Sequence, residues 1–129
     1  MKAYWDSSAI VEAFNDPQWL ARLKSERGFT RPHALAETFS TLTGNPKTRI
    51  DASDAATVIE RLSASLDFVE LTAPETLSAL KATREKGVRG GRVHDYLHAV
   101  AAEKSGAKKI LTLDKNDFDG ITSLEIESD

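Results

Sequence analysis

The chain has 129 residues, with 17 Lys and Arg against 20 Asp and Glu, and it contains no Cys. This length fits a single domain over residues 1–129, and the missing cysteines exclude disulfide scaffolds, thiolate nucleophiles and thiolate-bound metal sites. The formal net charge of −3 argues against a protein that holds nucleic acid by uniform positive charge. No apolar run approaches the roughly 20 residues that span a bilayer, and Asp6 interrupts any signal sequence. We therefore expect a cytoplasmic protein without membrane association.

Short apolar runs alternate with helical patterns along the chain, which is typical of α/β proteins. The predicted order is a strand at 2–6, helices at 8–15 and 17–24, an extended segment at 29–31, helices at 33–43 and from 51, a strand at 68–71, helices at 72–87 and 94–105, and strands at 109–113 and 121–126. Helices that separate strands predict a sheet covered on both faces. We expect a three-layer α/β/α domain with a mostly parallel central sheet.

Two helices show which face they bury. The helix that begins near Asp51 has an apolar stripe of helical period, formed by Ala55, Val58, Ile59, Leu62 and Leu66. The helix at 33–43 has a stripe formed by Leu35, Phe39 and Leu42. Glu37 lies about 160° from that stripe at about 100° per residue, so we expect it outside the core.

Four acidic residues stand where chemistry is expected in an open parallel sheet. Asp6 and Asp114 each follow a predicted strand, and the carboxyl ends of such strands form the usual active-site edge. Asp95 lies in a first helical turn, and Glu37 is in mid-helix. Ordinary structural explanations also exist: Asp6 can N-cap the next helix, and Asp114 can form an Asx turn. Asp95 is favoured by the helix dipole, and Glu37 can simply be solvated.

Convergence of these acids would have a chemical consequence. Carboxylates gathered at one sheet edge repel one another unless a cation lies between them. Oxygen ligands select hard ions, Mg²⁺ or Mn²⁺, over zinc. A carboxylate-held ion of this kind is the usual apparatus for phosphodiester hydrolysis. The set therefore predicts a metal-dependent hydrolase of phosphodiesters.

Four segments resemble, in order, the motifs of PIN-domain nucleases. They are Tyr4-Trp5-Asp6-Ser7-Ser8-Ala9-Ile10-Val11, Thr30-Arg31-Pro32-His33-Ala34-Leu35-Ala36-Glu37-Thr38-Phe39, Gly90-Gly91-Arg92-Val93-His94-Asp95-Tyr96-Leu97-His98-Ala99 and Leu111-Thr112-Leu113-Asp114-Lys115-Asn116-Asp117-Phe118. The similarity spans essentially the whole chain. The small size is most similar to the toxin ribonucleases of VapBC toxin–antitoxin pairs.

The resemblance implies a Mg²⁺- or Mn²⁺-dependent endoribonuclease that leaves a 3′-hydroxyl and a 5′-phosphate. Asp6, Glu37 and Asp95 match the three main catalytic and metal-binding acids. Asp114 matches the fourth, with Asp117 as a secondary candidate. Two hydroxyl residues match supporting positions, Ser8 and Thr112.

The resemblance also implies partners. Toxin-like members form homodimers, and an antitoxin segment occupies a groove near the active site. Three apolar residues of the early helices fit either such a groove or the core: Phe14, Trp19 and Leu20. A non-catalytic RNA-binding or scaffold module of the same fold is the alternative to a nuclease.

A zinc peptidase is a more remote alternative. His94 and His98 stand at i,i+4 on one predicted helix face, as in the His-Glu-x-x-His zinc helix, but with Asp95 in place of Glu. The third histidine, His33, lies far upstream, so any downstream ligand must be a carboxylate. We expect instead that His94 and His98 are partly exposed helix residues.

Residues 81–92 hold five Lys and Arg against one Glu, a local charge of +4. This pattern is typical of a solvated helix face. It also places Arg89 and Arg92 on the Gly-rich loop that leads to Asp95. There the two arginines are candidates for binding RNA phosphates.

Overall fold

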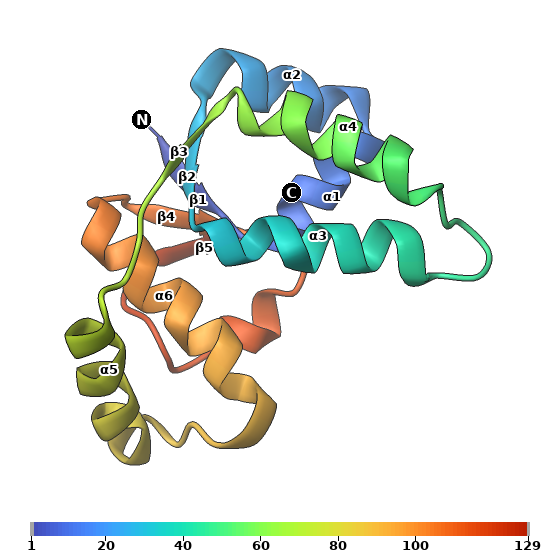
Figure 1. Ribbon diagram of the computed structural model, residues 1–129. Coiled ribbons are helices and arrows are strands. Elements are labelled where there is room, and N and C mark those ends of the chain that lie inside the picture. Colours follow the sequence, from blue (N-terminus) through green and yellow to red (C-terminus); the bar gives the residue numbers. More distant parts are fainter. Residues whose placement is uncertain (1, 129) are drawn as a thin grey trace.

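The computed structural model describes residues 2–128, which form a five-stranded sheet with helices on both faces (Figure 1). The strands are β1 (Ala3–Trp5), β2 (Gly28–Thr30), β3 (Leu66–Phe68), β4 (Lys109–Leu111) and β5 (Glu125–Glu127), in the sheet order β3-β2-β1-β4-β5. Every neighbouring pair is parallel. The predicted α/β class and parallel sheet are therefore confirmed, and the sheet is parallel throughout.

Six α-helices connect the strands in the predicted order. They are α1 (Ser7–Asn15), α2 (Pro17–Glu26), α3 (Pro32–Gly44), α4 (Ala52–Ser63), α5 (Ala73–Lys86) and α6 (Val93–Ser105), with short 3₁₀ turns η1 (Gly90–Arg92) and η2 (Lys115–Phe118). Thr72 and Glu75 form the expected capping box at the start of α5. Gly87 ends that helix in the left-handed conformation, at φ 67°.

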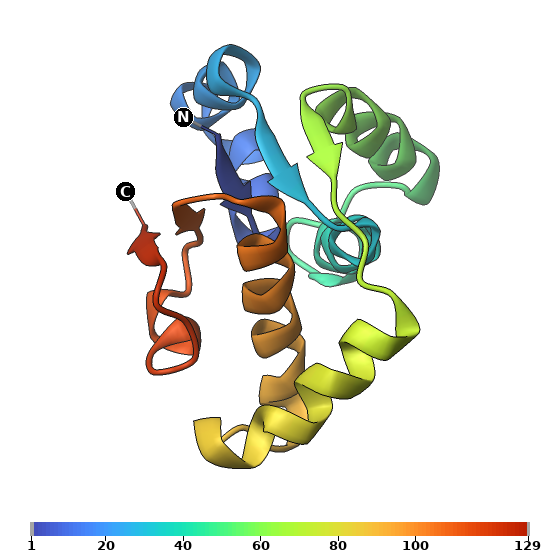
Figure 2. The same cartoon turned by 90° about the vertical axis from the view of Figure 1, so that its left-hand side faces the viewer.

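The central strand β1 separates two cores, because successive side chains point to opposite faces. Tyr4 packs into the core below α5 and α6, and Trp5 packs into the core below α1, α2 and α4. Both side chains are almost fully buried, at 0% and 1% exposure. Figure 2 shows the two helical layers on either side of the sheet. β1 thus carries its carboxyl end, and with it Asp6, to the middle of the sheet edge.

The predicted strand at 68–71 was placed too late. Helix α4 ends at Ser63, and Leu66 begins β3 instead of extending the helical stripe. Leu66 and Leu62 belong to the same core cluster, so burial alone does not separate a helical from an extended position. The predicted last strand at 121–126 was instead placed too early, since β5 begins at Glu125 and has three residues.

The predicted stripe of α3 was also wrong in part. The helix buries Ala34, Thr38 and Leu42, whereas Phe39 is 37% exposed. Small residues at 34 and 38 let α3 lie against α1 and α4, which it contacts. Glu37 therefore lies beside the buried face, next to Thr38.

Within residues 2–128, no helix is both long enough and apolar enough to cross a membrane.

Candidate active site

Asp6 lies directly after β1 and has both of the roles considered for it, an N-cap and a sheet-edge acid. Its Oδ1 accepts a hydrogen bond from the backbone N–H of Ala9 at 3.0 Å and another from Ser8 Oγ at 2.7 Å. The residue is only 6% exposed. Burial raises the pKa of Asp6, and the hydroxyls of Thr112 and Ser8 oppose that rise. Asp6 is thus a buried carboxylate at the carboxyl end of the central strand.

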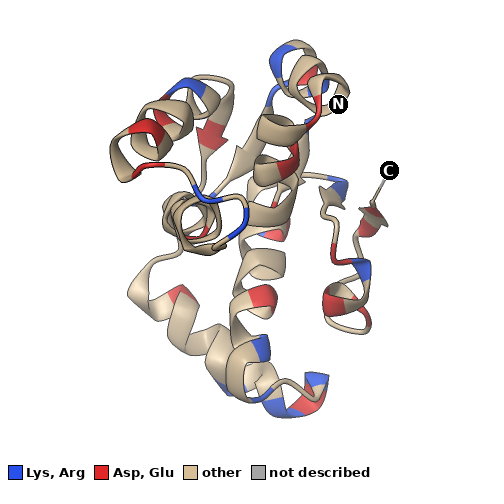
Figure 3. Cartoon of the chain, turned by 90° about the vertical axis from the view of Figure 1, so that its right-hand side faces the viewer, with Lys and Arg blue, Asp and Glu red and all other residues tan. Residues whose placement is uncertain are grey.

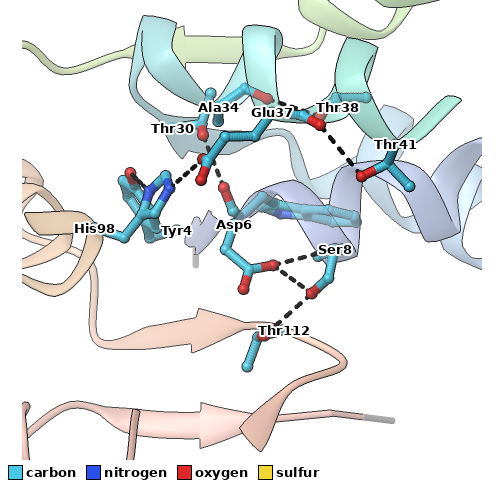
Figure 4. A network of polar contacts seen from close by, with 12 residues as sticks. Tyr4, Asp6, Ser8, Thr30, Ala34, Glu37, Thr38, Thr41, His98 and Thr112 are labelled. Carbon is cyan, nitrogen blue, oxygen red and sulfur yellow. Dashed lines mark hydrogen bonds and ion pairs between the residues drawn. The ribbon is translucent and has the colours of Figure 1, made fainter. Parts of the chain in front are cut away.

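Ser8 and Thr112 join the ends of β1 and β4. Their hydroxyl oxygens lie 3.1 Å apart (Figure 4). Ser8 Oγ also accepts a hydrogen bond from the backbone N–H of Leu113 at 2.9 Å. Thr112 Oγ1 accepts the backbone N–H of Asp114, also at 2.9 Å. These contacts hold the loop after β4 against the Asp6 turn. The fourth motif is therefore brought to the same sheet edge as the first.

Glu37 reaches this edge from α3. Its Oε1 lies 2.6 Å from Nε2 of His98 on α6, and Nδ1 of His98 lies 2.7 Å from the hydroxyl of Tyr4. Figure 4 shows the carboxylate and the imidazole pointing toward each other. Burial by itself would raise the pKa of Glu37, but the hydrogen bond with His98 and the nearby charges of His98, His33 and His94 lower it. Glu37 is therefore half-buried and bonded, not simply solvated.

His94 and His98 differ in their surroundings. His98 is 2% exposed, so the expectation that it is a partly exposed helix residue was wrong. His94 is exposed, and its ring stacks on that of His33 with 6.0 Å between centroids. Since both ring nitrogens of His98 already have partners, no nitrogen remains for zinc. The i,i+4 histidine pair therefore does not form the zinc-binding face of a peptidase helix.

Asp95 stands half-buried in the first turn of α6. Its pKa is raised from an ordinary value of 3.8 to about 6, first by burial and then by the negative charge of Asp117. Asp6 and Glu37 raise it further, while His98 opposes them. The charges of four carboxylates from β1, α3, α6 and η2 thus act at one place. Asp114 and Asp117 are both exposed, and of the two it is Asp117 that contributes a leading charge to the raised pKa of Asp95.

The two arginines of the Gly-rich loop lie differently. Arg92 donates a hydrogen bond to the backbone carbonyl of Asp119, and Arg89 is exposed. Figure 3 shows Lys and Arg gathered at the end of α5 and in the following loop, beyond the start of α6. The cationic segment therefore borders the element that carries Asp95.

The side chains at the acidic edge offer the type of ligand atom that a hard divalent cation prefers. All of these ligand atoms are oxygens, and two of the acids, Asp6 and Asp95, have raised pKa values. Within residues 2–128 no Lys or Arg pairs with Asp6, Asp95 or Asp117. As the side chains stand, no three acidic or histidine residues in the described part of the chain are arranged to hold an ion. Binding would therefore require the carboxylates to close in. An ion there would offset the mutual repulsion that the four acids show.

The fold and this acidic edge define a PIN domain. The family model described as PIN domain matches residues 3–123, so the chain belongs to the PIN-domain family. Members are generally nucleases and typically use divalent metal ions. The resemblance seen in the four sequence motifs is confirmed.

Solved structures agree with this assignment. A chain in the crystal structure of VapBC2 from Rickettsia felis, bound to a DNA fragment from their promoter, is 18% identical and superposes with a TM-score of 0.70, covering 98% of each chain. PAE2754 from Pyrobaculum aerophilum is also 18% identical, with a TM-score of 0.68 over 98% of this chain and 89% of that one. No curated protein matches the sequence. At this identity the likeness concerns the fold.

Sequence reasoning missed the roles of His98 and Tyr4. One signal was available for each. His98 is near the small residues Ala99, Ala101 and Ala102, whose size suits a closely packed helix, and Tyr4 lies two residues before Asp6, which in an extended chain places both side chains on the same side. The contact between them joins positions 94 residues apart and had no local signal.

Proposed function

We propose that this chain is a Mg²⁺- or Mn²⁺-dependent endoribonuclease and the toxin of a VapBC-like toxin–antitoxin pair, acting in the cytoplasm. One observation carries the proposal. The charges of Asp117, Asp6 and Glu37 raise the pKa of Asp95 at the carboxyl edge of the parallel sheet, and among residues 2–128 no Lys or Arg pairs with Asp6, Asp95 or Asp117. A fold gains no stability from such an arrangement, so a bound cation and its chemistry explain it better than packing does.

In this proposal Asp6, Glu37 and Asp95 hold the ion. The charge of Asp117 raises the pKa of Asp95 more than that of Asp6 or Glu37 does, which favours Asp117 as the fourth acid, although Asp114 is the preferred match to the fourth motif. When bound, such an ion supplies activation of the attacking water and offsets charge on the leaving oxygen. Ser8 and Thr112 fix the Asp6 turn against the β4 loop, and His98 holds the Glu37 carboxylate.

RNA is the proposed substrate, and Arg89 and Arg92 are proposed to bind its phosphates. Arg92 donates a hydrogen bond to the backbone carbonyl of Asp119, and this contact directs its guanidinium toward the loop after η2. Arg89 makes no such contact and is exposed. We expect Arg89→Ala to weaken RNA binding and to reduce the slope of log affinity against log salt by about 1. An unchanged slope would remove Arg89 from the interface.

An antitoxin segment is the proposed protein partner, in addition to a second copy of the chain. A cavity of about 310 Å³ opens between α1, α2 and α4. Phe14, 40% exposed, and Leu20 line it, and Lys24 and Arg61 contribute positive charge. Trp19 does not line the cavity; it is partly buried and packs edge-on against the core residue Trp5, with 5.7 Å between centroids. The cavity therefore suits an apolar segment with acidic residues.

The nuclease proposal is tested by RNA cleavage with Mn²⁺ or with EDTA. Asp6→Asn removes the charge but keeps a good N-cap, so the fold should survive. Asp16→Asn is the matched control, because Asp16 caps α2 in the same way outside the acidic edge. We expect cleavage only with Mn²⁺, abolished by Asp6→Asn and retained by Asp16→Asn. Cleavage indifferent to EDTA would refute the mechanism, and RNA binding without cleavage would favour a scaffold module.

A further inference from the structure

Two buried side chains and the half-buried Glu37 form a continuous chain of hydrogen bonds behind the acidic edge. The Tyr4 hydroxyl lies 2.7 Å from Nδ1 of His98, and Nε2 of His98 lies 2.6 Å from Oε1 of Glu37. Tyr4 and His98 are 0% and 2% exposed, and their rings meet edge to face. Water therefore has little access to the contact between Tyr4 and His98, and such bonds are strongest where water is excluded, whereas the contact between His98 and Glu37 is part-buried.

The chain joins the three elements that carry the three main acids. Tyr4 is on β1, two residues before Asp6. His98 is on α6, three residues after Asp95, and Glu37 is itself on α3. Among residues 2–128, no backbone hydrogen bond joins α3 to α6. The imidazole is thus a direct polar link between the helix of the second acid and the helix of the third.

The protons in this chain follow from the chemistry of its members. An ionised Glu37 carboxylate can only accept, so Nε2 of His98 carries the proton between them. In the neutral form of the imidazole, Nδ1 is then the acceptor, and the Tyr4 hydroxyl, 2.7 Å away, donates to it. Tyr4 therefore selects the tautomer that points a donor at Glu37.

We propose that His98, held by Tyr4, is a positioning residue that fixes the Glu37 carboxylate for the divalent cation, an inference that rests on the proposed metal-dependent nuclease. A free Glu side chain samples several rotamers, and fixing it in advance removes that cost from ion binding. Oε1 is occupied by the imidazole. Oε2 has no hydrogen-bond partner among residues 2–128 and remains free for the ion. Contacts behind a ligand typically change metal affinity or activity by about 10- to 100-fold.

The test compares His98→Leu, which removes the donor, with His98→Gln, whose side-chain amide restores one. Mn²⁺ affinity is measured by calorimetry on each folded protein, and kcat and KM for RNA cleavage are measured alongside. We expect His98→Leu to weaken Mn²⁺ binding by about 10- to 100-fold and to lower kcat with little change in KM. His98→Gln should recover most of the loss in Mn²⁺ affinity and most of the loss in kcat. Tyr4→Phe should give values between those of His98→Leu and His98→Gln.

Thr38→Val is the matched control for a purely structural effect. It removes a buried hydroxyl next to Glu37 whose partner is the Ala34 carbonyl in the same helix. We expect it to reduce stability while leaving Mn²⁺ affinity unchanged. Equal losses in His98→Gln and His98→Leu, or no loss in His98→Leu, would overturn the inference.

The imidazole of the wild-type protein provides a readout that does not depend on any variant folding. Long-range ¹H–¹⁵N spectra of metal-free protein should show a proton on Nε2 of His98, as its contact with Glu37 requires. Protonation at Nδ1 alone would overturn the inference, even if His98→Leu fails to fold. If wild-type protein neither binds Mn²⁺ nor cleaves RNA, the proposed function fails and the inference with it. If the wild-type protein does both and His98→Leu matches it, the inference alone fails.

Discussion

Replacing Asp95 by Asn separates a structural from a functional role for this acid. An Asp in the first turn of a helix normally stabilises it by about 0.3–1 kcal/mol through the helix dipole. Asp54 stands at such a position in α4, is exposed and lies outside the acidic edge. Asp95 has the same helical position in α6, but its charge is opposed by burial and by other carboxylates. The two substitutions should therefore change stability in opposite directions.

The magnitude follows from the raised pKa of Asp95. A rise from 3.8 to about 6 corresponds to about 3 kcal/mol against the charged form, at about 1.4 kcal/mol per pH unit. The side chain is only half-buried, so solvent screening reduces this to about 1–2 kcal/mol. Without metal at neutral pH, Asp95→Asn should raise the free energy of unfolding by that amount. Asp54→Asn should lower it by about 0.5 kcal/mol.

The pH dependence has a definite sign. Because the folded pKa of Asp95 lies above its ordinary value, the protonated form favours the fold. In EDTA, the free energy of unfolding of Asp95→Asn should equal that of wild type below pH 3.8. The excess of the variant over wild type should grow between pH 3.8 and about 6 and stay constant above that pH. Urea unfolding across this range measures it.

Adding Mn²⁺ should reverse the order of stabilities. An ion that binds only the folded protein stabilises it by about 2.7 kcal/mol at 100 times its dissociation constant. Wild-type protein should show such a gain, and Asp95→Asn should gain much less. If Asp95→Asn instead destabilises the metal-free protein as much as Asp54→Asn does, Asp95 is an ordinary helix-start residue and the reasoning is refuted.

Three further predictions concern other parts of the molecule. Asp117→Asn should lower the Mn²⁺ affinity measured by calorimetry at least about 10-fold, while Asp114→Asn should leave it unchanged. A larger loss of affinity in Asp114→Asn than in Asp117→Asn would identify Asp114 as the fourth acid. Gly28→Ala should cost about 1–3 kcal/mol in thermal or urea unfolding, because a Cβ there would lie 2.6 Å from Nε1 of buried Trp5; an unchanged stability would mean that Trp5 moves freely. Hydrogen-bonded ion pairs with Arg22 and Lys109 lower the pKa of Glu127 from 4.5 to about 2, so the stability that its charge contributes should be lost as pH falls from 4.5 to about 2. In Glu127→Gln, the free energy of unfolding measured in urea should therefore depend less on pH over that window.

The order of elements was predictable because local signals mark most boundaries. Pro17 and the Thr72–Glu75 box start helices, and Gly87 and Gly106 end them in left-handed conformations. The strands were harder, since each has three residues and is defined by partners far away in the chain. Leu66 shows the limit: its apolar side chain satisfies both a helical period and a buried strand. Only pairing with Gly28 on β2 decides between them.

The acids were predictable for a different reason. Asp6 follows a strand whose neighbours on either side are parallel, and parallel strands end at one edge, so position along the chain already predicts position in space. The partner of Glu37 was not predictable in this way. His98 lies 61 residues away, and its own i,i+4 spacing with His94 pointed to a different chemistry. Spacing reports a shared helix face, but burial decides which of two residues on that face meets solvent.

The distribution of charge explains how a chain of net charge −3 could act on a polyanion. Its acids at the sheet edge and its +4 segment at 81–92 are separate features, which adjoin where η1 leads into α6. On the proposed function, the edge would repel RNA until a cation is bound, whereas the cationic segment would attract it at any metal concentration. The two contributions can therefore be separated. Substituting Arg89 should change the salt dependence of RNA binding and leave its Mn²⁺ dependence intact, and substituting Asp6 should do the opposite. If both substitutions changed both dependences equally, the edge and the segment would form a single electrostatic site.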